Sequence, residues 1–420
     1  MIGSILTLCI VGSNAIPDSL LASLEEPWLA PGYTVEELLA LNPRELGEPF
    51  PEPPSPVPLY AVAPFLHRDS SGVHLRLGIG TASQVLLLED GQPVRSIEVH
   101  LDEIYRVSFS RDVTWAVGLP LPWSDYPCFL LDMLVGEHCS YPSPEGMGIP
   151  ETDVSHHGFL LVYTGNCTLI EPWTGWRLEL LYEYPQEIAR AAGGGLCAFL
   201  MREGLRHGDF RLAVTDGDGI ELWQATGTDE GAMGLCITPD GQTLVVTRES
   251  GVEVLDGQTG TLLWSGPGDV FDGSLMTSDD GSKACLCCRS ARSVPEHAGE
   301  ALTRIACLSL RPDIGLLWET CADSRSLAGA RVEAVSNEGR CLVLLDGGPD
   351  RPFMNGFLLL DGQGLPVWSS GNLEPGFEEI FDATCGSFLE DRATSALFED
   401  LVFYVDRMAC RLLRIAPTDQ

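Results

Sequence analysis

From about residue 73 onward, the chain alternates short apolar runs with polar turn residues. The runs are four to eight residues long and rich in Val, Leu, Ile and Phe, and Asp-Gly, Asn-Glu-Gly or Gly-Asp turns separate them. This spacing is typical of antiparallel β-strands joined by tight turns, and the 3.6-residue periodicity of amphipathic helices is almost absent. The pattern predicts an all-β domain over residues 73–417.

One stretch shows the building block clearly. Residues 235–247 read as a strand, a Pro-Asp-Gly turn and a second strand, and two further strands follow at 251–256 and 260–264. Four consecutive antiparallel strands form a meander with two apolar faces, and both faces need neighbours to cover them.

The same pattern recurs along the chain. The turn at Asp240 is repeated at Asp280, 40 residues later, again at residues 336–342, and in degenerate form at residues 108–117. The end of the unit also recurs, as Leu222-Trp223, Leu263-Trp264, Leu317-Trp318 and Val367-Trp368. Upstream, Glu179 aligns with the Trp position and residues 88–95 begin the series; downstream, residues 401–405 and 411–415 supply two more strands.

Four-stranded units that recur every 40 to 50 residues predict a β-propeller, in which the units stack radially as blades. The count predicts about seven blades, with six or eight as alternatives, and we expect Trp223, Trp264, Trp318 and Trp368 to be equivalent wedges between blades.

One unit carries a family resemblance. Residues 256–264 match the pattern D-x-x-T-G-x-x-x-W and resemble the quinoprotein-like (PQQ-repeat) propellers, and the turn at 239–241 resembles that of WD-repeat and YVTN-type propellers. Residues 171–179 keep only the Thr-Gly, and residues 361–368 are one residue short. The resemblance implies that the Trp packs between blades and that the Thr-Gly turn reaches an adjoining blade. This is a structural motif, and it implies no cofactor.

The N-terminal region differs in composition. Residues 1–58 hold ten of the 29 prolines, and the proline run at 49–58 must be extended, as a linker or as a strap on the folded body. Residues 34–42 read as a short helix with a Thr34–Glu37 capping box and Pro43 as its stop. The segment around 34–43 also resembles the second half of a LysM carbohydrate-binding module. We therefore expect short helices and a strap over 16–58.

Residues 1–15 have the short apolar centre and following small residues of a signal peptide, without the positive n-region. The run is too short to span a bilayer, so we expect no transmembrane segment. Cleavage after Ala15 would remove one of the 14 cysteines and leave an odd number. The pattern favours an extracytoplasmic protein, periplasmic or secreted, with a cytoplasmic one as the alternative.

The charge limits the partners. The chain has 25 basic and 60 acidic side chains, a net charge of −35. Such a charge argues against nucleic acid and anionic membranes. We expect a monomer with a protein, peptide or glycan ligand at a propeller rim.

Two groups of residues suggest chemistry. Cys287-Cys288 are adjacent, as in the quinone site of quinoprotein alcohol dehydrogenases, but they lie in an apparent inner strand, where buried cysteines are the favoured interpretation and a disulfide is another. The acidic calcium ligands and catalytic Asp of those enzymes match no motif, so neither calcium nor pyrroloquinoline quinone is predicted as a cofactor.

The irregular segment 119–157 contains residues of the types that bind metal ions, and we favour a solvated loop over a metal site for this segment. These residues are Glu137, His138, Cys139, Glu151, Asp153, His156 and His157. Cys128 and Cys139 could form a disulfide.

Other motifs are weak. No G-x-S-x-G occurs, and Gly193-Gly194-Gly195 lacks the context of a phosphate loop. Residues 216–219 read as a turn rather than a calcium loop, and Asn166-Cys167-Thr168 fits the glycosylation sequon. The sequence identifies no catalytic, cofactor-binding or metal-ligating residue.

The sequence predicts a non-catalytic binding or scaffold module whose loops hold a ligand at one rim. Irregular inserts at 119–157, 290–303 and 346–355 are the expected contact regions. The alternative is a propeller enzyme, either a quinone-dependent dehydrogenase or a metal-dependent lactonase, with acidic, Asn or His side chains lining an axial funnel.

Overall fold

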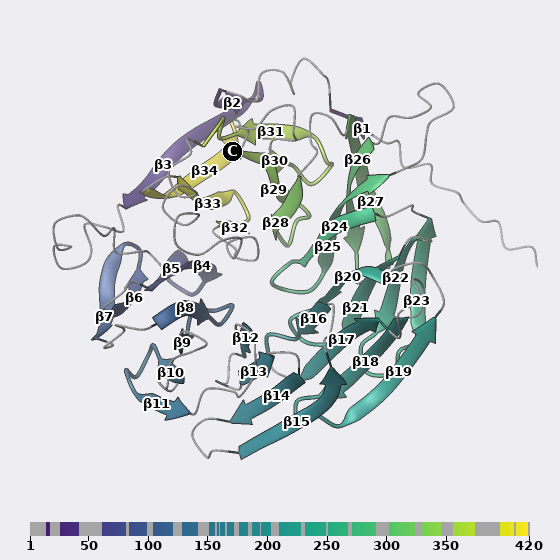
Figure 1. Cartoon of the computed structure of the whole chain (residues 1–420). Coiled ribbons are helices and arrows are strands. Elements are labelled where there is room, and N and C mark those ends of the chain that lie inside the picture. Colours follow the sequence, from purple (N-terminus) through teal and green to yellow (C-terminus); the bar gives the residue numbers. More distant parts are fainter. Residues whose placement is uncertain are drawn as a thin grey trace, which may run out of the picture.

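The strands form eight sheets arranged in a ring around one axis (Figure 1). The structure is a computed structural model. It describes residues 14–16, 26–41, 61–80, 84–98, 104–120, 128–141, 151–155, 158, 160–163, 166–171, 176–183, 187–193, 195–202, 210–227, 232–248, 251–267, 271–290, 302–323, 330–345, 356–373, 395–406 and 409–418. Every regular element in these residues is a β-strand. The predicted all-β propeller is confirmed, with eight blades.

Blades 1 to 4 each consist of four consecutive antiparallel strands, from the innermost to the outermost. Their strands are β4 (Ala61–Arg68), β5 (Val73–Gly80), β6 (Gln84–Glu89) and β7 (Gln92–Glu98); β8 (Ile104–Phe109), β9 (Trp115–Pro120), β10 (Cys128–Asp132) and β11 (His138–Tyr141); β12 (Glu151–Val154), β13 (Leu160–Tyr163), β14 (Asn166–Glu171) and β15 (Trp176–Glu183); and β16 (Glu187–Arg190), β17 (Leu196–Arg202), β18 (Phe210–Asp216) and β19 (Glu221–Gly227).

Blades 5 to 7 repeat this order, and blade 8 completes the ring. Their strands are β20 (Ala232–Ile237), β21 (Thr243–Arg248), β22 (Gly251–Asp256) and β23 (Leu262–Pro267); β24 (Phe271–Thr277), β25 (Lys283–Ser290), β26 (Leu302–Ser309) and β27 (Gly315–Asp323); β28 (Arg331–Val335), β29 (Cys341–Leu345), β30 (Gly356–Leu360) and β31 (Pro366–Ser369); and β32 (Ser395–Phe398), β33 (Leu401–Asp406) and β34 (Ala409–Pro417).

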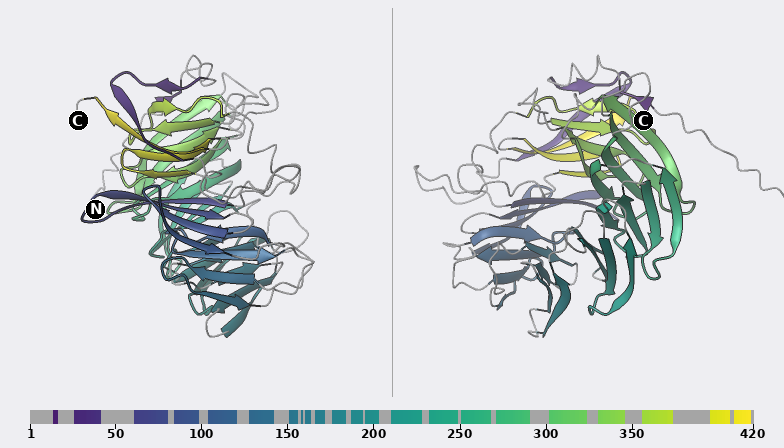
Figure 2. Two further views of the ribbon diagram at one scale, coloured as in Figure 1. Left: turned by 90° about the vertical axis from the view of Figure 1, so that its left-hand side faces the viewer. Right: turned by 45° about the vertical axis from the view of Figure 1, so that its right-hand side comes forward.

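The N-terminal region supplies three more strands at the outer edges of blades 6, 7 and 8. These strands are β1 (Asn14–Ala15), which runs parallel to β27, β2 (Trp28–Leu29), which is antiparallel to β31, and β3 (Tyr33–Leu41), which is antiparallel to β34. Figure 1 and Figure 2 show these purple strands on the outside of the green and yellow blades. Because β3 is the fourth strand of blade 8, pairing between the two ends of the chain closes the ring.

The predicted helix over 34–42 is wrong, because these residues form β3. Its Glu36 and Glu37 pair with Arg414 and Arg411 of β34, and Leu39 packs against the core shared by blades 8 and 1. A local capping box could not compete with an open edge of β34 that offers a full ladder of hydrogen bonds. The segment is thus part of the propeller rather than of a LysM-like module, and the propeller boundary at residue 73 was also wrong, since β4 begins at Ala61. The proline run at 49–58 lies outside the described residues.

Apolar clusters lie between blades. Seven clusters are described, and each joins two consecutive blades, such as blades 4 and 5 or blades 7 and 8. In the described residues, blades 1 and 4 to 8 are therefore covered on both faces by their neighbours, which is the condition that the sequence pattern imposed.

The four tryptophans occupy equivalent positions, as predicted. Each lies on the outermost strand of its blade, next to a β-bulge, and packs against the following blade. The Trp223 Nε1–H donates to the Gly257 carbonyl of blade 5 over 2.9 Å, and the Trp318 Nε1–H donates to the Gly339 carbonyl of blade 7 over 3.1 Å.

Two of these Trp rings pack directly against a turn glycine of the next blade. A Cβ on Gly260 would lie 2.8 Å from the Trp223 ring, and one on Gly364 would lie 2.6 Å from the Trp318 ring. Both glycines have φ near +70° to +80° (68° and 78°), a conformation that favours glycine. The reach of the Thr259-Gly260 turn to an adjoining blade is confirmed.

Blades 1, 2, 3 and 8 lack this Trp, and blades 1 and 3 show two different departures from the pattern. In blade 1, Arg95 takes the Trp position after the same bulge, and its Nη2 donates to the Leu134 carbonyl of blade 2 over 2.7 Å. In blade 3, the strand β15 has no bulge at this point, so Leu178 pairs with Leu169 and Glu179 pairs with Thr168. The alignment of Glu179 with the Trp position is therefore one residue out of register.

The turns between the first two strands of a blade repeat closely. In blade 5, the Asp240 carboxylate accepts from the Thr238 hydroxyl (2.8 Å) and the Gln242 N–H (3.1 Å), while the Thr238 Oγ1 accepts from the Thr243 N–H (3.0 Å). Blades 2 and 6 use the same scheme with Ser110-Asp112 and Ser278-Asp280. In blade 2 the glycine of this turn is replaced by Val113, which is buried with φ +58°.

The antiparallel order sorts all connections onto two rims. We call the rim with the turns that follow the first and third strand of each blade the turn face, and the opposite rim the loop face. Connections at the turn face have at most five residues. The nine connections of seven or more residues all join strand ends at the loop face: 16–27, 42–60, 121–127, 142–150, 203–209, 291–301, 324–330, 346–355 and 370–394.

We expect Gly260→Ala to destabilise the ring. The new Cβ would both require an unfavourable positive φ and collide with the Trp223 ring, at a cost of about 1–3 kcal/mol. Gly315→Ala is the matched control, because Gly315 starts the outer strand of blade 6 and has nothing within 4 Å of its Cβ position. Urea unfolding followed by tryptophan fluorescence should show a lower midpoint for G260A alone. Equal midpoints for the two variants would contradict the wedge mechanism.

Candidate functional site

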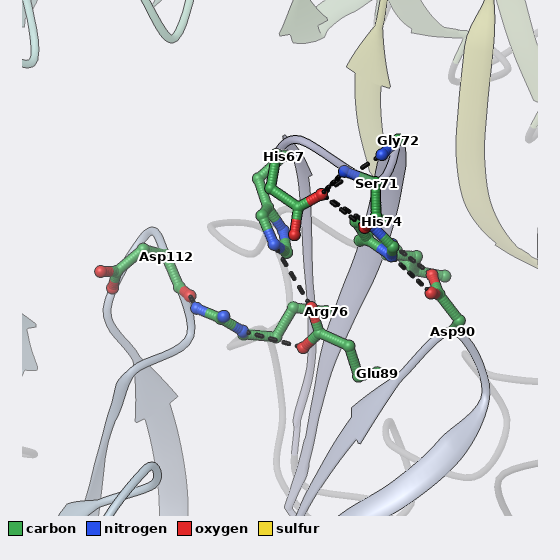
Figure 3. A network of polar contacts seen from close by, with 10 residues as sticks. His67, Ser71, Gly72, His74, Arg76, Glu89, Asp90 and Asp112 are labelled. Atoms are coloured by element: carbon green, nitrogen blue, oxygen red, sulfur yellow. Dashed lines mark hydrogen bonds and ion pairs between the residues drawn. The ribbon is translucent and has the colours of Figure 1, made fainter.

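The densest polar network lies on the turn face of blade 1, at the β4–β5 hairpin (Figure 3). His74 stands between two carboxylates: its Nδ1 is 2.7 Å from Asp90 Oδ2, and its Nε2 is 3.2 Å from Asp69 Oδ1. The Ser71 Oγ lies 2.7 Å from the same Nε2. Asp69 itself accepts from the backbone N–H and hydroxyl of Ser71, both at 2.6 Å, and from the Gly72 N–H at 3.2 Å.

These contacts decide the protonation states. The hydrogen bonds from Ser71 lower the pKa of Asp69 to about 2, so this carboxylate is ionised at neutral pH. The hydrogen bond to Asp90 is the largest cause that raises the pKa of His74 above its ordinary value. The network therefore favours an imidazolium held between two carboxylates.

A second group of contacts continues the network into blade 2. His67 Nε2 is 3.3 Å from Glu89, and its ring stacks on Phe65 with centroids 5.5 Å apart. The Arg76 Nε donates to the other oxygen of Glu89 over 3.1 Å, and its Nη1 donates to the Asp112 carbonyl over 3.2 Å. Arg76 thus ties the second strand of blade 1 to the first turn of blade 2, as the labelled side chains in Figure 3 show.

The same turn of blade 2 reaches across the axis. The Arg111 Nε and Nη2 donate to Asp279 Oδ1 over 3.0 and 2.7 Å, and the Nη2 also donates to the Thr277 carbonyl over 3.0 Å. Arg111 belongs to blade 2 and Asp279 to blade 6, and these blades are opposite each other in a ring of eight. This ion pair therefore spans the axis at the turn face.

Ser71, His74 and Asp90 have the distances of a Ser-His-Asp triad, but their surroundings oppose nucleophilic catalysis. A catalytic histidine must be neutral to accept the serine proton, whereas two carboxylates favour protonation of His74. The Ser71 hydroxyl and the N–H groups of Ser71 and Gly72 all donate to Asp69, so none of these hydrogen bonds is directed at an oxyanion. The arrangement stabilises the hairpin and presents a charged surface.

Sequence reasoning did not find this network. Asp69, Ser71 and His74 are neighbours in the sequence, in and just after an Asp-Ser-Ser-Gly turn, but Asp90 is 16 residues from His74 and belongs to the next hairpin. The convergence of Asp90 on His74 depends on the pairing of β5 with β6.

The predicted metal-ligand types do not converge in the residues described. Glu137 and His138 are exposed at the end of a turn in blade 2, and Glu151 and Asp153 lie on β12 of blade 3. His156 and His157 fall outside the described residues. No group of three or more His, Cys, Asp or Glu residues suited to a metal ion occurs in the described part of the chain.

The cysteines behave as buried strand residues where their side chains are described. Cys285 and Cys287 are buried in the cluster between blades 6 and 7, and burial raises the pKa of Cys285. The side chain of Cys288 is outside the description. Cys128 pairs with Tyr141 and Cys139 with Leu130, so the two cysteines are diagonal neighbours. No disulfide joins the ten cysteines described, Cys128 and Cys139 included.

The weaker motifs are structural. The Asp216 carboxylate accepts from the N–H groups of Asp218 (3.0 Å) and Ile220 (2.8 Å) and so closes the predicted turn. The Gly193 N–H donates to the Pro239 carbonyl of blade 5 over 3.2 Å. Asn166 begins β14 of blade 3.

Comparison with solved structures found several distantly similar chains, and β-propellers are among them. The chain is similar to the β-propeller domain of Swd1 from Myceliophteria thermophila (10% identity, 86% of this chain, all of that chain, TM-score 0.42). It is also similar to the hydrazine synthase of Kuenenia stuttgartiensis (12%, 76% and 98%, TM-score 0.44) and to a eukaryotic initiation factor (11%, 75% and 97%, TM-score 0.44). The propeller fold itself is established by the strand pairing described above.

No family model matches this chain, and no curated protein does. In the described residues, no helix has the length and apolar character needed to cross a membrane.

We expect His74 to titrate above the ordinary histidine value of about 6.5. Because the pKa is raised in the folded state, the His74–carboxylate interaction stabilises the fold below the unfolded pKa and is lost as the pH rises through the folded one. Asp90→Asn should lower the pKa of His74 in an NMR titration of the imidazole signals. Asp218→Asn, in a turn of blade 4, is the control and should leave it unchanged. An unshifted His74 in D90N would refute the assignment.

Proposed function

We propose that this protein is a non-catalytic binding or scaffold propeller whose loop face holds a protein, peptide or glycan partner. One observation carries the proposal: all nine connections of seven or more residues leave strand ends at the loop face, while the turn face has only connections of up to five residues. Long connections on a rigid scaffold are where proteins place binding residues. Of the inserts expected as contact regions, 290–303 and 346–355 correspond to connections between strand ends at this rim. The expectation of one irregular insert over 119–157 was wrong, because this stretch contains β10, β11 and β12, and only the connections 121–127 and 142–150 join strand ends at the loop face.

The composition of these nine connections supports a basic partner. They contain 20 acidic residues and 6 arginines, with no lysine. A protein or peptide with Lys and Arg would be attracted to such a rim, and the attraction would weaken with ionic strength. The aromatic residues in them, such as Trp123, Tyr126 and Phe353, are types that often anchor binding interfaces.

The described chemistry supports binding over catalysis. On the turn face, the Arg111–Asp279 ion pair spans the axis where a propeller enzyme would need an open funnel, and the hydrogen bond to Asp90 raises the pKa of His74, which favours its protonated form. We further propose that the protein works outside the cytoplasm, as the signal-like pattern of residues 1–15 suggests. Fractionation of source cells with an antibody to the protein would test this location.

Capture from source-cell extract tests the proposed function. The bait would be the full chain, compared with a variant in which 291–301 and 346–355 are each replaced by a four-residue Asn-Gly turn. The expected result is a partner retained by the wild type and at least tenfold less by the variant. Asp216→Asn with Asp218→Asn on the turn face is the matched control and should retain the partner.

Two results would overturn the proposal. One is equal capture by the loop-replaced variant. The other is turnover of a sugar, alcohol or lactone by the purified chain alone, or heat released on titration with pyrroloquinoline quinone and calcium, because either would assign an enzymatic role.

A further inference from the structure

The chain covers three of its own outer blade edges with extended segments. The Ala30 N–H, just after β2, donates to the Val367 carbonyl of blade 7 over 2.9 Å, and the Ile16 N–H, just after β1, donates to the Cys321 carbonyl of blade 6 over 3.0 Å. Where β2 lies on blade 7, Val367 and Trp368 are only 2% and 4% exposed. The molecule thus shows what kind of segment fits an outer edge: an extended one with an adjacent aromatic and aliphatic residue, Trp28-Leu29.

The outer edge of blade 4 has the same geometry without a cover. In the sheets described, β19 is the last strand of blade 4, and Figure 1 shows it at the periphery of the ring. Leu222, which is equivalent to Val367, is 39% exposed, and nearby Ile220 is 64% exposed. Trp223, which is equivalent to Trp368, is half-buried.

The equivalence with blades 6 and 7 also identifies which backbone N–H and C=O groups of β19 are available to pair with an added strand. Trp28 pairs with Ser369, one residue after Trp368, and the Ile16 N–H reaches Cys321, three residues after Trp318. In an antiparallel sheet, the N–H and C=O groups of alternate residues point to opposite sides of a strand. The corresponding residues one and three positions after Trp223 are Gln224 and Thr226, whose backbone groups therefore point away from β18.

Other uncovered outer strands carry features that discourage pairing. Proline, charge and short length are the usual protections of an edge strand. These protections are Pro93 in β7, the four-residue length of β11, Arg177, Glu179 and Glu183 in β15, and Pro267 in β23. The stretch Trp223–Gly227 of β19 has neither a charge nor a proline.

We propose that β19 binds an extended segment of a partner protein, which adds to blade 4 as a fifth, antiparallel strand. This segment would place an aromatic residue opposite Gln224 and an aliphatic residue opposite Trp223, as Trp28 and Leu29 lie opposite Ser369 and Trp368 on blade 7. The next residue would lie opposite Leu222, as Ala30 lies opposite Val367, and Lys or Arg would flank the segment on either side. A second copy of this chain is a poor occupant, because each copy has a net charge of −35 and the two would repel. Main-chain hydrogen bonds at an exposed edge provide affinity in such complexes.

A synthetic peptide and one edge variant test this proposal. The probe is the fluorescein-labelled peptide Lys-Lys-Pro-Trp-Leu-Ala-Lys-Lys, and fluorescence anisotropy measures its binding to the full chain. Gln224→Pro removes the outward N–H of β19 without loss of a bond to β18, a position at which an edge strand tolerates proline. We expect at least tenfold weaker binding for Q224P, whereas Gln224→Ala, which keeps the N–H, should bind within twofold of the wild type.

The unfolding midpoint of Q224P shows whether this variant folds. If it does not, a second variant tests the proposal. Leu222→Ser changes only an exposed side chain, and we expect it to weaken binding at least threefold. Three results would overturn the proposal: no saturable binding of the peptide, unchanged binding to both Q224P and L222S, or dimerisation of the wild type that Q224P abolishes. The loop-face variant should bind this peptide normally, so failure here is distinct from failure of the proposed function.

Discussion

The structure depends on the packing of the outer strand of one blade against the following blade. A four-stranded sheet with two apolar faces cannot exist alone in water, so each blade needs a neighbour on both sides. The bulge on the outer strand turns one large side chain toward the following blade, where a turn receives it, as Gly260 receives Trp223. This contact is made by a tryptophan in blades 4 to 7 and by Arg95 in blade 1. The first and last blades are joined by β3 through its pairing with β34.

The two rims follow from the same repetition. Turns with Ser or Thr and Asp close one rim tightly, and the Arg111–Asp279 pair spans its axis. On this rim the acidic residues serve mainly the backbone: Asp69, Asp240 and Asp280 accept hydrogen bonds from their own turns, which lowers their pKa values. The connections of seven or more residues all leave strand ends at the opposite rim.

The N-terminal region shows that outer edges of this propeller accept extended segments. Within one chain, β1, β2 and β3 cover three successive blades. The edges of blades 1, 3 and 5 are protected by proline or charge. In the described residues, no further strand pairs with β19 of blade 4, whose stretch Trp223–Gly227 has neither a charge nor a proline. The proposed binding at the loop face and the proposed binding at the edge of blade 4 would thus be two separate uses of one scaffold.

The sequence by itself determined the features that repeat locally. The strand pattern, the Asp240 and Asp280 turns and the four tryptophans each follow from spacing within one hairpin, so the fold class and the wedge positions could be predicted. Tertiary structure decided whatever depends on distant pairing. It made 34–41 a strand rather than a helix, because β34 supplies distant partners such as Arg411, which is 374 residues from Glu37. This strand completes an eighth blade, where the sequence had predicted about seven. The pairing of β5 with β6 brought Asp90 to His74, and closure of the ring brought Arg111 to Asp279, because it places blades 2 and 6 opposite each other.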